Sequence, residues 1–299
     1  MAKPTAKSAL KFIVKIALSA LAIYLVFSKI ELDEVWSLVR QSNPVYLLGA
    51  LLFFNLSKWI SALRLLTLFR TIGVNISGNY NLRLYYIGMF YNLFLPGGIG
   101  GDGYKIFHLN KKGSTSKREL FSAVLLDRMS GAALLAFLAL AITLFQESIL
   151  ELFPSFWRYL IIVGALLAIP ALVLLIRLAF AKFNSVTTQV IHWSLWVQVA
   201  QLVCAWFILS AYGVNDHFTI YFVLFLVSSI AAMLPISFGG VGLRELVFLY
   251  ASQELPIDQT AAVALGLVFF LITALSSFIG VFLRLPAEDS LNKVDAAEL

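Results

Sequence analysis

Two glycine-rich motifs in this 299-residue chain carry residue types that bind anions. Residues 95–105 read LPGGIGGDGYK and residues 234–244 read LPISFGGVGLR. Aligned without gaps at an offset of 139 residues, the two motifs share Leu, Pro, three Gly and a final basic residue. The first amides of a helix are unpaired and its dipole is positive there. A helix that begins after Gly103 or Gly242 would therefore attract an anion.

Basic and glycine residues of these motifs are the first candidates for an anion-binding site. Lys105 and Arg244 fall in the first turn of the two expected helices and add full positive charge, which suits a phosphate or carboxylate headgroup. The glycines at the two tips that belong to this candidate site are Gly100, Gly101, Gly239 and Gly240.

Asp102 and Glu245 are the carboxylates beside these cations. An Asp immediately before a helix is an ordinary amino-terminal cap, so Asp102 is either a cap alone or a cap that also has a functional carboxylate. Glu245 also has two interpretations. It supports Arg244 or exchanges protons, or it is a second acid of the cap region. In the functional interpretations, both acids restrain the neighbouring cations or couple passage of the ligand to protons.

Charged residues also interrupt long apolar segments at Lys58, Arg64, Asp127 and Arg128. A charge at the bilayer centre costs at least about 2.5–3.5 kcal/mol on insertion scales unless it is paired. Adjacent residues on a helix point about 100° apart, so Asp127 and Arg128 need partners on neighbouring helices or in a polar cavity. Arg128 then has either a role in a cavity or a purely structural ion pair. Arg64 either joins the site or extends to the membrane surface.

The composition places all these charges in a membrane protein. The chain is 61% hydrophobic and 13% charged, whereas soluble chains average roughly 45–50% and about 25%. A water-soluble fold is therefore excluded. At about 20 apolar residues per span, the chain holds roughly seven or eight spans and leaves no room for a separate soluble catalytic domain. The single cysteine, Cys204, excludes an internal disulfide and a zinc site built on several thiolates.

The expected fold is an all-α polytopic membrane protein with a single integral membrane domain over residues 1–299. Six apolar segments are long enough to be full spans, at residues 10–27, 44–69, 119–145, 158–178, 193–212 and 260–283. Residues 31–40 predict an amphipathic interfacial helix. Residues 82–110 and 218–252 are also apolar, but Pro and Gly interrupt each of them near the middle. We therefore expect two re-entrant helical hairpins there.

The distribution of charge orients this fold. With a cytoplasmic amino terminus and hairpins that return to their own side, the opposite face holds three basic and eight acidic residues. The cytoplasmic face holds 14 of the 22 basic residues: Lys3, Lys7, Lys11, Lys15, Arg70, Arg83, Lys111, Lys112, Lys117, Arg118, Arg177, Lys182, Arg284 and Lys293. This satisfies the positive-inside rule. We expect a bacterial or archaeal cytoplasmic membrane protein with both termini, including a tail at 286–299, in the cytoplasm.

The two hairpins open to opposite sides in this arrangement. Residues 44–145 then form a first repeat of span, hairpin and span, and residues 190–283 form its inverted counterpart. Inverted repeats whose broken helices meet near the bilayer midplane are a recurrent plan of alternating-access transporters. The alternative interpretation is two unrelated kinks at Pro and Gly.

Motifs for other chemistries fail on their context. Residues 98–103 satisfy G-x-G-x-x-G, but no strand precedes them, so a dinucleotide is not expected. His108, His192 and His217 have neither an i,i+4 partner nor clustered carboxylates, so no metal site is expected. The net charge of +6 reports orientation and contact with anionic lipid, not nucleic acid. We expect no cofactor and no catalytic residue.

The two motifs, with Asp127-Arg128 between them, resemble a flippase-like family. The resemblance rests on the motifs Pro-Gly-Gly-x-Gly-Gly-Asp at 96–102 and Leu-Pro-x-Ser-x-Gly-Gly-x-Gly-x-Arg-Glu at 234–245. This family forms the membrane region of lysylphosphatidylglycerol synthases, and the resemblance extends over residues 10–285. It implies a stand-alone member without the soluble synthase domain, which helps a phospholipid to cross the bilayer without aminoacyl transfer.

The resemblance also implies that Asp102, Arg128 and Arg244 lead the functional residues, whereas Asp127 stands where the family more often has Glu. The expected function is a lipid flippase that binds an anionic headgroup, of a phospholipid or a polyprenyl-phosphate-linked lipid, between the hairpins. Two alternatives stay open: a membrane-embedded glycolipid transferase or its subunit, and a secondary transporter of a small anionic solute. Besides the bilayer, the expected partners are an envelope-lipid biosynthetic enzyme and a second copy of the chain in a homo-oligomer.

Overall fold

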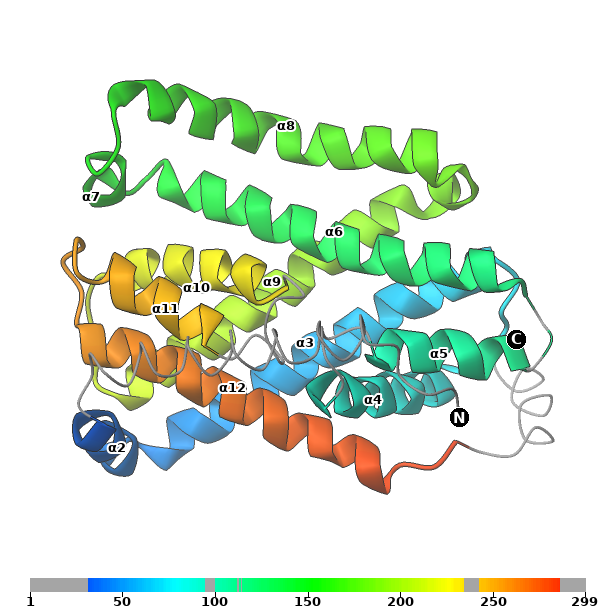
Figure 1. Cartoon of the computed structure of the whole chain (residues 1–299), viewed down its shortest axis with the longest axis horizontal. Helices are drawn as coiled ribbons and strands as arrows, with labels where there is room; N and C mark the ends of the chain where they lie inside the picture. Colours follow the sequence, from blue (N-terminus) through cyan, green and yellow to red (C-terminus); the bar gives the residue numbers. More distant parts are fainter. Residues whose placement is uncertain (1–31, 95–99, 112, 114, 234–241, 286–299) are drawn as a thin grey trace, which may run out of the picture.

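The computed structural model describes residues 32–94, 100–111, 113, 115–233 and 242–285. These residues form helices and no strand (Figure 1). The helices are α2 (Leu32–Gln41), α3 (Pro44–Thr71), α4 (Gly78–Phe94), α5 (Gly100–Lys111), α6 (Lys117–Thr143), α7 (Glu147–Leu150), α8 (Ser155–Ala179), the 3-10 helix η2 (Ala181–Val186), α9 (Thr187–Ala211), α10 (Phe218–Met233), α11 (Leu243–Ala251) and α12 (Gln259–Phe282).

Five helical segments are long and apolar enough to cross a membrane: α3, α6, α8, η2 with α9, and α12. They correspond to five of the six predicted spans and fit the all-α membrane class. The sixth predicted span, residues 10–27, lies outside the described residues. The fifth begins earlier than predicted, because residues 187–192, four of which are polar, continue the helix and Val190 is buried.

Polar caps decide where several of these spans begin. Asn43 precedes α3 and its side chain accepts a hydrogen bond from the backbone N–H of Val45 at 3.0 Å. Asp258 caps α12 in the same way through the N–H of Ala261, at 2.6 Å. A side-chain oxygen that satisfies an otherwise unpaired amide fixes the first turn of a helix. The apolar run alone therefore does not set these boundaries.

Each interrupted apolar segment forms two short helices packed side by side, α4 with α5 and α10 with α11. They have 17, 12, 16 and 9 residues, and at 1.5 Å per residue each is shorter than a hydrocarbon core of about 30 Å. In Figure 1, α4 starts at the right and α5 returns to the right. By contrast, α10 starts at the left and α11 returns to the left. The two pairs therefore enter the molecule from opposite ends.

The start of α5 corrects one prediction. This helix begins at Gly100, four residues before the position predicted for its start, directly after Gly103. It can do so because Gly101 lies against the backbone of Gly88 in α4, where a Cβ on Gly101 would be 1.8 Å from the carbonyl oxygen of Gly88. The side chain of Asn92 accepts a hydrogen bond from the N–H of Gly101 at 2.7 Å. Asp102 therefore lies inside the first turn and is not the cap.

The same shift moves Lys105, which lies in the second turn of α5 and not in the first as predicted. In the second hairpin, α11 begins at Leu243, directly after Gly242, as predicted, and Arg244 lies in its first turn. Gly242 has a φ of 85°, which favours glycine. The carboxylate of Glu245 accepts a hydrogen bond from the N–H of Gly242 at 2.8 Å, so Glu245 caps this helix.

One sequence offset relates the two halves of the fold. Adding 139 to the bounds of α4 gives 217–233, and α10 runs from Phe218 to Met233; adding 139 to α6 gives 256–282, and α12 runs from Gln259 to Phe282. The same operation places α3 on α9 and α5 on α11. The offset read from two short motifs thus holds over the whole of both halves.

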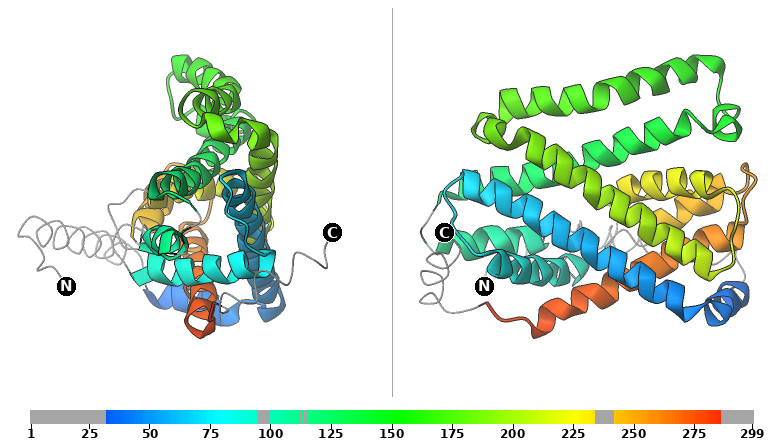
Figure 2. Two further views of the ribbon diagram at one scale, coloured as in Figure 1. Left: turned by 90° about the vertical axis from the view of Figure 1, so that its right-hand side faces the viewer. Right: turned by 180° about the vertical axis from the view of Figure 1, so that it is seen from behind.

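The halves also interlock in a reciprocal way (Figures 1 and 2). The longest contact joins α3 to α9, the first helices of the two halves. Then α4 packs against α12, and its counterpart α10 packs against α6, so each hairpin lies on the last helix of the other half. The order of elements and the packing are thus reciprocal between the two halves.

Charge separates toward the two ends of the molecule. The connections at the right end of Figure 1 join α3 to α4, α5 to α6 and α8 to α9, and they carry Arg70, Lys111, Lys117, Arg118, Arg177 and Lys182. The connections at the left end carry mainly acids, which are Glu147, Glu151, Asp216, Glu254 and Asp258. This is the asymmetry from which the sequence predicts the orientation.

Replacing Gly101 by Ala tests the close approach of α4 and α5. The added Cβ overlaps the backbone of Gly88, so we expect a loss of about 1–3 kcal/mol of stability from overpacking. Thermal unfolding of the purified protein in detergent measures the effect. Gly103→Ala is the matched control on the same helix, since nothing lies within 4 Å of its added Cβ. Equal melting temperatures for the two variants would contradict the contact.

Candidate functional site

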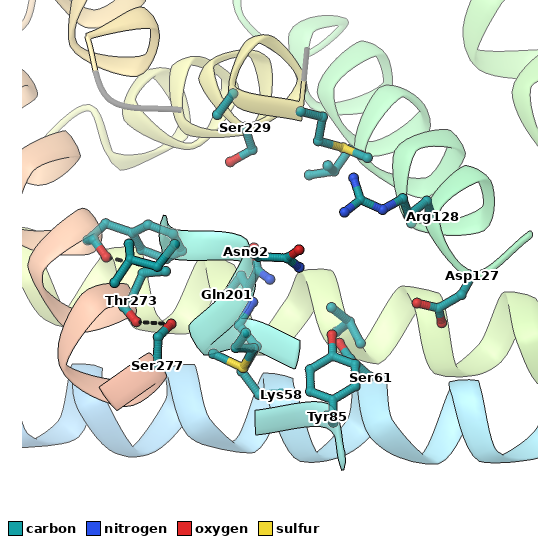
Figure 3. A pocket seen from close by; sticks show the side chains of 18 of the residues that line it. Lys58, Ser61, Tyr85, Asn92, Asp127, Arg128, Gln201, Ser229, Thr273 and Ser277 are labelled. Atoms are coloured by element: carbon teal, nitrogen blue, oxygen red, sulfur yellow. Dashed lines mark hydrogen bonds between the residues drawn. The ribbon is translucent and has the colours of Figure 1, made fainter. Parts of the chain in front are cut away.

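A pocket of about 340 Å³ lies where the two halves meet. Four helices from each half line it, α3 to α6 and α9 to α12. Figure 3 shows side chains from these helices around one open space, with the guanidinium of Arg128 directed into it. Its volume is in the range of ligand pockets, about 300–1,000 Å³.

The pocket carries more positive than negative charge. Its five basic and three acidic side chains leave an excess of two positive charges. The basic residues are Lys58, Arg64, Lys105, Arg128 and Arg244, and the acidic residues are Asp102, Asp127 and Glu245. Seven of these eight were predicted as site residues from the sequence. The tertiary fold therefore brings together charges that are up to 187 positions apart in the chain.

Asp102 connects two of the predicted cations. One carboxylate oxygen accepts from Lys105 Nζ at 3.2 Å, and the other forms an ion pair with Nε of Arg128. Lys105 also lies over the ring of Tyr85, with Nζ 4.6 Å from the ring centroid. The side chains of Asp102 and Lys105 are 8% and 6% exposed, whereas that of Arg128 is 32% exposed. Arg128 is thus both an ion-pair partner and the most accessible member of this trio.

Asp127 has a different partner, Arg64. The guanidinium Nε of Arg64 lies 2.7 Å from a carboxylate oxygen of Asp127, and its Nη1 donates to the hydroxyl of Ser194 at 2.9 Å. The prediction that Asp127 and Arg128 find partners on neighbouring helices is confirmed. The alternative that Arg64 extends to the membrane surface is wrong, because Arg64 is 5% exposed and held between α6 and α9.

Arg244 lies on the opposite side of the pocket without a carboxylate. Its Nη1 donates to the hydroxyls of Ser228 and Ser229 at 3.3 and 3.0 Å. Its guanidinium lies over the rings of Phe225 and Phe269, 5.3 and 4.7 Å from their centroids. Among the described residues no ion pair includes Arg244.

Glu245, the neighbour of Arg244, is buried and turned to the N–H of Gly242. This contact agrees with the interpretation of Glu245 as an acid of the cap region. Within the described part of the chain, Glu245 forms no ion pair with Arg244. Of the glycines predicted for the site, Gly100 opens α5 and Gly101 packs on α4. Gly239 and Gly240 lie outside the described residues.

Lys58 is the charged pocket residue that the sequence analysis leaves without a role. It lies on α3, and its Nζ is 4.5 Å from the ring centroid of Phe54. No ion pair within the described chain includes it. The signal was available, because Lys58 interrupts the same apolar segment as Arg64.

Neutral polar side chains complete the lining, and sequence reasoning missed all of them: Ser61, Tyr85, Asn92, Gln198, Gln201, Ser229, Thr273 and Ser277. Gln198 is 3% exposed, its amide nitrogen donates to the carbonyl of Gly131 at 3.4 Å, and its amide oxygen has no partner among the described residues. Two amides three residues apart, Gln198 and Gln201, within the apolar segment 195–209 of α9 were the one available signal.

The Arg64–Asp127 pair makes a stability prediction. Arg64→Met leaves the buried carboxylate of Asp127 without its cation, and loss of one partner of a buried pair costs about 3–5 kcal/mol. The double variant Arg64→Met/Asp127→Leu should recover most of that loss, because neither charge remains. Unfolding of four proteins in detergent, the wild type, Arg64→Met, Asp127→Leu and the double variant, gives the coupling energy. Arg158→Met is the control, since its pair with Glu147 is exposed and 3.9 Å long. A double variant no more stable than Arg64→Met would contradict the assignment.

Comparison with known proteins completes the description of the site. No curated protein matches the chain. The family described as lysylphosphatidylglycerol synthase TM region matches residues 12–192 and 183–280. These two segments include the whole of the pocket lining and both halves of the fold. The resemblance seen in the two motifs is thereby confirmed, and the chain belongs to the lysylphosphatidylglycerol synthase TM region family.

Proposed function

We propose that this protein moves a lipid with an anionic headgroup between the leaflets of the cytoplasmic membrane. The observation that carries the proposal is the pocket between two oppositely directed helix pairs, with its excess of two positive charges inside an apolar helical protein. A charged headgroup is expensive to place in hydrocarbon. A polar pocket between the halves lowers that cost while the acyl chains stay in the surrounding lipid. The family of the chain supports a role with membrane lipids.

In this proposal the two cations related by the 139-residue offset, Lys105 and Arg244, receive the headgroup phosphate from opposite sides. Arg128 provides the contact between them. Asp102 forms ion pairs with both Lys105 and Arg128 and so compensates part of their charge. An entering phosphate competes with Asp102 for Arg128, which is the exposed member of that trio. Asp102 thereby acts as an internal substitute for the ligand anion and returns the site to its resting state after release.

The proposed orientation puts the basic end of the molecule in the cytoplasm, with α4 and α5 entering from that side and α10 and α11 from the other. Both pairs are then re-entrant, and each half presents one hairpin to one leaflet. Alternation between the two halves would expose the pocket to each leaflet in turn. An envelope-lipid biosynthetic enzyme would supply the lipid at one leaflet.

Labelling of single cysteines tests this topology. In a Cys204→Ser background, Asn79→Cys and Lys111→Cys flank the first hairpin, and Asp216→Cys and Gln253→Cys flank the second; all four positions are exposed. We expect a membrane-impermeant maleimide to label the second pair of sites on intact cells and the first pair only after permeabilisation. Different accessibility within either pair of sites would show that the hairpin crosses the membrane.

Transport is tested in proteoliposomes with acyl-labelled phosphatidylglycerol and a quencher that reaches only the outer leaflet. We expect the protein to expose the inner-leaflet lipid, and Arg244→Ala and Asp102→Asn to slow it about 10- to 100-fold, because a hydrogen bond to a charged group contributes about 1.5–3 kcal/mol. Arg158→Ala, an exposed residue outside the pocket, is the control and should keep the wild-type rate.

A rate equal to that of protein-free vesicles, or full transport by both pocket variants, would overturn the proposal. Extraction of the lipid after the assay separates transport from chemistry. A covalently altered lipid would support a transferase instead.

A further inference from the structure

The carboxylates of the pocket are all engaged with other groups. Asp102 holds Lys105 and Arg128, Asp127 holds Arg64, and Glu245 accepts from the backbone N–H of Gly242. Within the described lining, a positively charged group of a ligand would therefore find no carboxylate that is available, because Asp102 keeps its contact with Lys105 when a phosphate takes Arg128. The pocket lining therefore disfavours binding of a positively charged ligand group.

Two cations of the pocket, in contrast, have no carboxylate in the described part of the protein: Lys58 and Arg244. They rest on one continuous cluster of rings. Lys58 lies over Phe54, Arg244 lies over Phe225 and Phe269, and the Phe269 ring contacts both other rings, with centroids 5.4 Å from Phe54 and 4.8 Å from Phe225. The rings hold the two cations at one wall of the pocket. Together these cations form a subsite for one phosphate.

A second wall offers neutral hydrogen-bonding groups. Among the described residues, the buried amide oxygen of Gln198 has no donor, and such an acceptor is costly unless a ligand or water supplies the hydrogen. Gln201 lies one turn further along α9 and lines the same pocket. Asn92 on α4 and Thr273 on α12 also line this pocket (Figure 3). This wall fits hydroxyl groups, which both donate and accept.

We infer that the ligand is a phosphodiester lipid whose headgroup is a neutral polyol, such as glycerol, inositol or a sugar. Lys58 joins Arg244 in binding the phosphate on the side opposite to Lys105 and Arg128, and a headgroup hydroxyl donates to the amide oxygen of Gln198. The inference rests on the proposed function and narrows its substrate class. Headgroups with an ammonium group, such as ethanolamine or an aminoacyl group, are rejected. Their cation would lie among uncompensated cations without an available carboxylate.

The experiment compares headgroups on the same acyl chains. Proteoliposomes receive acyl-labelled phosphatidylglycerol, phosphatidylinositol, phosphatidylethanolamine, lysyl-phosphatidylglycerol or phosphatidic acid, and binding of the dioctanoyl forms is measured in parallel by thermal stabilisation in detergent. We expect the two polyol lipids to be moved and bound at least about tenfold better than the two lipids with an ammonium group. Phosphatidic acid, which has the phosphate but no polyol, should bind with an intermediate affinity.

Two variants separate the walls. Lys58→Gln should weaken binding of all three anionic lipids about tenfold or more. Gln198→Leu should weaken the polyol lipids alone and leave phosphatidic acid unchanged. Lys182→Gln and Gln189→Leu are the matched controls, since both side chains are exposed outside the pocket.

The outcomes distinguish this inference from the proposed function. Phosphatidylethanolamine or lysyl-phosphatidylglycerol bound or moved as well as phosphatidylglycerol would overturn the inference and leave the transport function standing. Selective binding of polyol lipids without transport would overturn the transport function and keep the binding specificity. Equal loss for all anionic lipids in Gln198→Leu would remove the role of the amide wall.

Discussion

Compensation of buried charge is the constraint on which this structure depends. The chain is apolar enough that a charge inside it must find a partner in the protein. Asp102 on α5 meets that requirement through Lys105 on its own helix and Arg128 on α6, and Asp127 meets it through Arg64 on α3. Because the partners lie on different helices, satisfying them fixes how these helices sit against one another. The ion pairs therefore define the architecture around the pocket as much as the apolar contacts do.

The reciprocal packing of the two halves explains where the pocket lies. Each short helix pair packs on the last helix of the other half, so the pairs cannot fill the centre between them and all eight helices border one space. The glycine contact between Gly88 and Gly101 lets α4 and α5 approach at backbone distance and leaves room for the side chain of Lys105 above Gly88. Close packing at the periphery of the hairpin thus coexists with an open polar centre.

The two halves share a plan but differ in charge. Lys105 and Arg244 occupy equivalent positions at the offset of 139, yet Lys105 has a carboxylate and Arg244 has serine hydroxyls and aromatic rings. At this position the first half therefore has a cation paired with a carboxylate, whereas Arg244 in the second half has no carboxylate among the described residues. The backbones of the two halves are approximately symmetric, but the side chains around these two cations are not. In the proposed transport, the headgroup would therefore bind Arg244 directly, whereas on the other side it would have to compete with Asp102.

Much of this was present in the order of residues. The hydrophobic runs predicted five of the described spans, the Pro and Gly interruptions predicted the breaks after Phe94 and Met233, and the rarity of charge in such segments singled out Arg64, Asp127 and Arg128. The error at Asp102 arose because the start of α5 depends on a contact between two backbones, which no local propensity records. Sequence by itself determined the class and the candidate charges, because hydrophobic length and charge placement are local properties. The tertiary structure alone decided which charges are paired, which remain free, and that Lys58 and Gln198 face the same space, since helices distant in the chain must pack before partners are assigned.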